Sequence, residues 1–147
     1  MKNLKQFFHT LSYIQYPLLL IGLYLIVKPL FRGFDYLTAN PEYLFGTYNN
    51  ALIFLGLTLS FAALQDSSKT SLKYEKRIWS NPKRAKTTIL FTLISMFVFL
   101  IAGLLGFIIK TSLFREFSYG SLILAIGLIG YLKLQLEIFE KQRERKM

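Results

Sequence analysis

The chain has 147 residues, the length of one domain, and 53% of them are hydrophobic, which is high for a soluble protein. Its formal net charge is +10, from 18 Lys and Arg against 8 Asp and Glu. The absence of cysteine excludes disulfides, and the single His9 has no carboxylate close in sequence, so we expect no metal site and no cofactor.

The first residues predict a short amphipathic helix over 2–9. Leu4, Phe7, Phe8 and Leu11 follow the i, i+3, i+4, i+7 spacing of one helical face, and polar residues occupy the other face. We expect this helix to lie in the inner membrane interface before the chain turns into a first span.

Four apolar stretches are long enough to cross a bilayer, which takes about 20 residues for roughly 30 Å of hydrocarbon. None carries a charged residue or histidine in its middle, and each is apolar nearly all round. The sequence therefore predicts an all-α integral membrane protein, one membrane domain over residues 1–147 that forms an antiparallel four-helix transmembrane bundle. The predicted spans are about 10–28, 44–65, 87–109 and 117–134.

The second span contains the polar segment "GTYNNA" near its outer end. Adjacent residues on a helix point about 100° apart, so Asn49 and Asn50 cannot face the same way, and we expect at least one to contact another helix. The alternative is a polar pocket or pore lined by Thr47, Asn50 and Thr58, which share approximately one face.

A basic loop over 66–86 joins the second and third spans, with a second interfacial helix predicted at about 70–79. Asn81-Pro82, like Asn40-Pro41 before span two, predicts a helix start with Asn as the N-cap. We expect one set of residues here to contact lipid headgroups or a partner: Lys73, Lys76, Arg77, Trp79, Lys83, Arg84 and Lys86.

Small residues predict close helix packing in the third and fourth spans. Ala102 and Gly106 are expected to face Ser121 and Ala125 across a short outer loop, and Gly56 with Ser60 gives helix two a comparable groove. The remaining small surface is available to a partner span or a second copy.

The tail over 135–147 is predicted to extend span four as a cytoplasmic helix, with Lys133–Glu137 and Glu137–Lys141 pairs. With the amino terminus inside, fourteen Lys and Arg lie on the inner side against four outside. This bias predicts that both termini are cytoplasmic. It also accounts for the net charge without nucleic acid, which we do not expect as a partner.

Three short motifs, "LQD" before a basic stretch, "KRIW" and "NPK", resemble a family of small uncharacterised four-span membrane proteins of Bacteroidota. The resemblance implies a bacterial cytoplasmic (inner) membrane and says nothing about mechanism.

No carboxylate lies within a span, and the acidic residues elsewhere are scattered, so we expect no enzyme activity. The sequence favours an accessory or interaction subunit that packs against another membrane protein or itself, with membrane lipids around it. A small oligomeric channel or carrier for a neutral or anionic solute is the alternative, and a membrane immunity or stress protein is a third.

Overall fold

The computed structural model describes residues 2–66, 78–109 and 111–144, and all regular secondary structure within them is helical. The predicted all-α class is confirmed, and four helical segments are long and apolar enough to span a membrane: Asn3–Arg32, Pro41–Ala62, Pro82–Ile108 and Phe114–Glu144. The interfacial helix predicted at 70–79 lies outside the described residues except for Ile78 and Trp79, which are helical.

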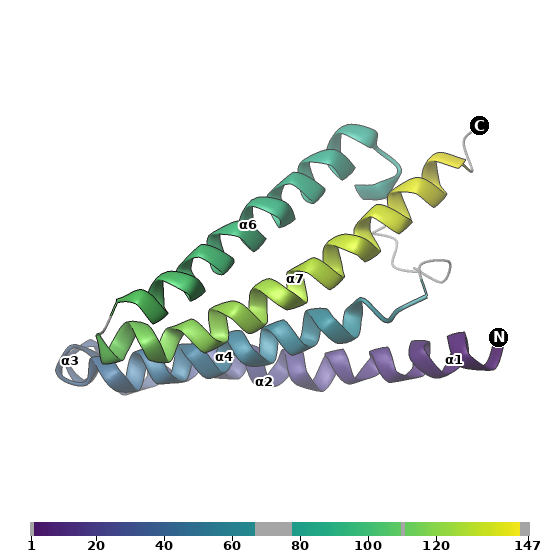
Figure 1. Ribbon diagram of the computed structural model, residues 1–147. Helices are drawn as coiled ribbons and strands as arrows, with labels where there is room; N and C mark the ends of the chain where they lie inside the picture. Colours follow the sequence, from purple (N-terminus) through teal and green to yellow (C-terminus); the bar gives the residue numbers. More distant parts are fainter. Residues whose placement is uncertain (1, 67–77, 110, 145–147) are drawn as a thin grey trace.

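The amino-terminal segment is one rod, and the predicted turn before the first span is wrong. Its parts are α1 (Lys2–Leu11), η1 (Ser12–Ile14), α2 (Gln15–Val27) and η2 (Lys28–Arg32), with α1 in line with α2 (Figure 1). Pro17 has no N–H for the Tyr13 carbonyl, and the helix tightens to a 3-10 turn just before it. Ser12 Oγ donates to the His9 carbonyl at 2.6 Å, so the rod continues through this point.

The other helices are α3 (Phe34–Ala39), α4 (Pro41–Ala62), α6 (Pro82–Ile108) and α7 (Ser112–Glu144). Asn81 caps α6 as predicted, since its side chain accepts from the Lys83 N–H at 3.0 Å. Asn40 does not cap α4. Its Nδ2 instead donates to the Tyr36 carbonyl at 3.1 Å, which closes the end of α3.

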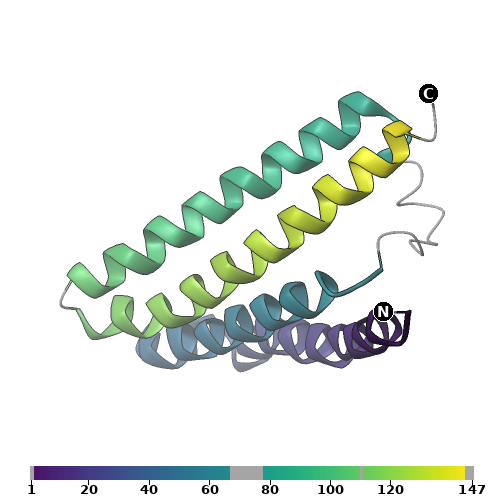
Figure 2. The same cartoon turned by 45° about the vertical axis from the view of Figure 1, so that its right-hand side comes forward.

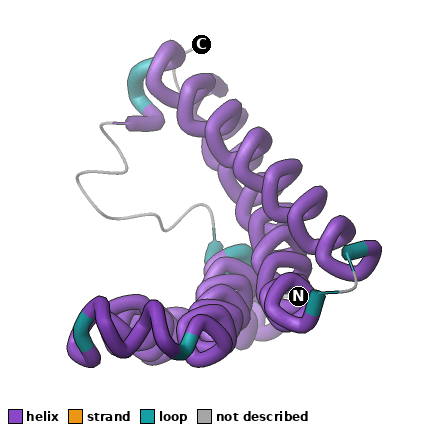
Figure 3. Tube along the Cα trace, turned by 90° about the vertical axis from the view of Figure 1, so that its left-hand side faces the viewer, coloured by secondary structure: helices purple, strands orange, loops and turns teal. Residues whose placement is uncertain are grey.

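The long helices lie in a row in the order α2, α4, α7, α6 (Figures 1 and 2). The pairs α2–α4 and α6–α7 are antiparallel, whereas α4 and α7 run in the same direction, with Asn49, Gly56 and Ala63 facing Gly120, Gly127 and Gly130. α4 packs against both α2 and α7, whereas α6 packs extensively on α7 alone. Viewed from the side in Figure 3, the α6–α7 pair stands at an angle to the α2–α4 pair. The fold is thus an open row, and the compact bundle that the sequence suggested is not formed.

Glycines allow α7 to approach its two neighbours, α4 and α6, closely. A Cβ added to Gly127 would lie 2.9 Å from the Gly56 carbonyl carbon and closer to its oxygen, so α4 and α7 cross with backbone against backbone. On the other side, a Cβ at Gly106 would lie 2.6 Å from the Phe114 carbonyl oxygen and closer still to Ser118 Oγ. Only residues without a side chain allow these approaches.

The predicted register between spans three and four differs from the structure. Gly106 meets Ser118 and Gly103 meets Leu122, whereas Ala102 is only half-buried. The reason is the connection, because α6 ends at Ile108 and α7 already begins at Ser112, which moves the facing positions toward the start of α7. Ser121 and Ala125 are nevertheless fully buried.

Candidate functional site around Trp79

Both chain termini lie at one end of the row, here called the terminus end, and α3 lies at the other, the loop end (Figure 1). At the terminus end Trp79 is 7% exposed and belongs to a cluster with Ala85, Leu134 and Ile138. Trp79 was predicted to contact lipid headgroups or a partner, and its burial leaves little of the indole exposed for such a contact. The Asn81 cap reverses the chain just after Trp79, and this turn places the indole between α6 and α7.

The described basic residues that were predicted to contact headgroups or a partner together with Trp79 differ from it in exposure. Lys83, Arg84 and Lys86 are exposed on the first turns of α6, as expected. Lys73, Lys76 and Arg77 lie outside the described residues.

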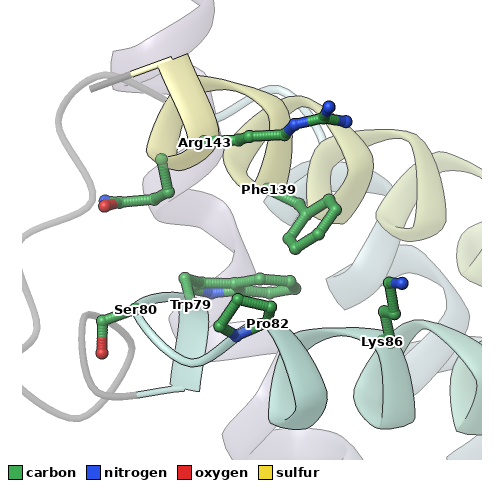
Figure 4. A pocket seen from close by; sticks show the side chains of 7 residues that line it. Trp79, Ser80, Pro82, Lys86, Phe139 and Arg143 are labelled. Carbon is green, nitrogen blue, oxygen red and sulfur yellow. The ribbon is translucent and has the colours of Figure 1, made fainter. Parts of the chain in front are cut away.

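A pocket of about 450 Å³ lies beside Trp79, and we call it the basic pocket. Figure 4 shows the Phe139 ring above the Trp79 ring and Pro82, with Lys86 to one side and Arg143 on the helix above. Two cations that line the same pocket as aromatic and proline surface favour an anionic group joined to an apolar body. Its lining, as described, is Trp79, Ser80, Pro82, Lys86, Phe139, Gln142 and Arg143.

A second pocket of about 410 Å³ also borders Trp79, and we call it the glutamine pocket because Gln15, Gln65 and Gln135 line it. Gln135 is 2% exposed, and its Oε1 accepts no hydrogen bond from any described residue. An unsatisfied buried polar group costs about 1–3 kcal/mol. Gln135 was not among the predicted site residues, although its amide within the apolar run "YLKLQLEIF" is a visible signal in the sequence.

The two asparagines of α4 lie at the loop end. Asn49 Oδ1 accepts from the Gly120 N–H of α7 at 2.7 Å, which is the interhelical contact expected of one of them. Asn50 is exposed, and both line a pocket of about 530 Å³ with Arg115 and Glu116.

Thr47, Asn50 and Thr58 do not form one polar face. Thr47 Oγ1 donates to the Tyr43 carbonyl at 2.7 Å within its own helix. Thr58 is buried far along α4 and lines the glutamine pocket, not the loop-end pocket of Asn50. The structure thus divides the predicted polar residues between opposite ends of the row.

The small residues of α4 serve the α4–α7 crossing. Gly56 is buried against α7, and Ser60 is half-buried with its Oγ donating to the Gly56 carbonyl at 2.9 Å. Within residues 2–66, 78–109 and 111–144 no group of three His, Cys, Asp or Glu is placed to hold a metal ion.

Comparisons of the chain with protein-family models, with curated proteins and with solved structures find no match.

Proposed function

We propose that this chain is a non-enzymatic, multi-pass protein of a bacterial cytoplasmic membrane that acts as an accessory subunit, packing against another membrane protein or a second copy. Four membrane-length apolar helices support the membrane assignment. The concentration of Lys and Arg at the terminus end supports cytoplasmic termini. A carboxyl-terminal green fluorescent protein should fluoresce and a carboxyl-terminal alkaline phosphatase should be inactive, and the reverse pattern would contradict this orientation.

The observation that carries the subunit proposal is the position of α6 at the edge of the row. α7 covers one face of α6, and the opposite face is apolar and exposed along its length, including Ile94 at 54%, Ile101 at 53% and Ile108 at 72%. These three isoleucines recur every seven residues and so form one stripe. In a membrane such a stripe contacts either lipid or another helix.

The natural absence of cysteine makes the test direct. Single-cysteine variants Ile94→Cys and Ile101→Cys, oxidised in native membranes, should form a disulfide-linked dimer if the partner is a second copy. A photo-crosslinking amino acid at the same positions should give one discrete larger product if the partner is another protein. The matched control is position 92, because Thr92 is buried against α7. Lipid alone covers α6 if neither stripe position gives a discrete product in either experiment.

Solute binding is a second candidate, and the loop-end pocket favours it. This pocket combines the Asn49 and Asn50 amides with Arg115 and Glu116, groups that suit a small polar or anionic solute. Protein in liposomes should then pass such a solute, and Asn50→Leu should abolish the flux without changing assembly, since Asn50 is exposed. Unchanged flux in Asn50→Leu would reject this role.

A further inference from the structure

We propose that the glutamine pocket binds a neutral lipid or amphiphile that carries a hydroxyl group. The first support is the Gln135 amide, which is 2% exposed and lines the pocket while its Oε1 accepts no hydrogen bond from the described part of the chain. Buried polar atoms in proteins almost always have a partner, so a hydrogen-bond donor from outside the chain fits this oxygen.

The two threonine hydroxyls that line the pocket also favour a ligand that donates a hydrogen bond. The hydroxyl hydrogen of Thr58 is directed to the Phe54 carbonyl at 2.8 Å, and that of Thr88 to the Arg84 carbonyl at 3.0 Å. Both threonine oxygens therefore retain lone pairs that only accept hydrogen bonds. With Gln135 Oε1 these make three acceptors, and the amides of Gln15 and Gln65 in the same lining can also donate, so a hydroxyl group, which both donates and accepts, fits the pocket.

The charge and size of the pocket define the rest of the ligand. No charged side chain is among the described residues that line it, and an ion in such surroundings would be strongly disfavoured. Leu19, Leu59 and Ile138 contribute hydrocarbon surface. The volume of about 410 Å³ suits a ligand and far exceeds the roughly 30 Å³ of one water molecule.

The position of the pocket allows a lipid to reach it from the membrane. Its lining comes from α2, α4, α6 and α7, so it spans the angle between the two helix pairs that Figure 3 shows. A hydroxyl headgroup would lie at Gln135, near the terminus end, with the hydrocarbon chain against Leu19 and Leu59.

The test uses purified full-length protein in detergent and three matched probes. Dioctanoylglycerol is neutral with one hydroxyl, trioctanoylglycerol has no hydroxyl, and dioctanoyl phosphatidic acid is charged. Trp79 is the only tryptophan of the chain and borders the pocket, so its fluorescence reports occupancy. We expect saturable binding of dioctanoylglycerol and at least tenfold weaker binding of the other two.

Two variants locate the site. Gln135→Leu should weaken dioctanoylglycerol binding at least tenfold, while Gln142→Leu, which alters the basic pocket, should leave it unchanged. If Gln135→Leu does not fold, as judged by circular dichroism, Leu59→Phe fills the pocket and should cause the same loss.

Three results would overturn the proposal: equal affinity for all three probes, unchanged binding in a folded variant with an altered pocket, or no binding, which would leave a hydrated cavity only. Because no partner protein is needed in this assay, its outcome is independent of the crosslinking test above.

Discussion

Substitution of Gly106 by alanine should separate α6 from α7 and destabilise the protein. The new Cβ would lie 2.6 Å from the Phe114 carbonyl oxygen, whereas real contacts are at least 3.0 Å, so the two helices must move apart. The Phe114 carbonyl belongs to the backbone and cannot rotate away, and Ser118 Oγ is closer still. Overpacking of this kind costs about 1–3 kcal/mol.

The matched control is Gly46→Ala, because nothing lies nearer than 3.7 Å to a Cβ at Gly46. Both variants gain the same helix propensity, about 1 kcal/mol, so the difference between them isolates the clash. Unfolding by dodecyl sulfate in mixed micelles, followed by Trp79 fluorescence, measures it, since Trp79 lies between α6 and α7. We expect Gly106→Ala to be about 1–3 kcal/mol less stable than Gly46→Ala.

The double variant Gly106→Ala with Ser118→Ala should recover part of that loss, because the nearest clashing atom is gone while the Phe114 carbonyl remains. If Gly106→Ala matches Gly46→Ala in stability, the close approach of α6 and α7 is not formed and the reasoning fails.

The remaining predictions concern Asn49, Trp79 and the basic pocket. Asn49→Leu removes the bond to the Gly120 N–H and should cost about 0.6 kcal/mol in the same titration, and Asn50→Leu should cost less; equal losses would contradict the assignment. Iodide should quench Trp79 only weakly in detergent, and strong quenching would contradict its burial. The pair Lys86→Gln and Arg143→Gln should weaken short-chain phosphatidylglycerol binding roughly 30-fold, from about 1 kcal/mol per cation, and an effect insensitive to salt would argue against it.

Sequence patterns with a local cause predicted the structure well. Asn81 caps α6 because a side-chain acceptor two residues before an N–H satisfies it in almost any context. Lys133 Nζ lies 3.9 Å from Glu137 Oε1, because residues four positions apart are neighbours on the surface of a helix. The helix α7 also continues to Glu144, as predicted for the tail. The side chain of Asn40 does not cap α4, because the short helix α3 before it offers the Tyr36 carbonyl as a competing hydrogen-bond partner.

By itself the sequence determined that the chain forms four membrane-length helices, since length and hydrophobicity are properties of each segment alone. Only the tertiary structure decided that these helices form an open row, that Trp79 is buried, and that Gln135 lies in a pocket with Thr58 and Thr88. The physical reason is that an apolar helix face packs equally well against lipid or protein. Backbone contacts such as Gly56 with Gly127 choose between the two, and they depend on residues that are far apart in the chain.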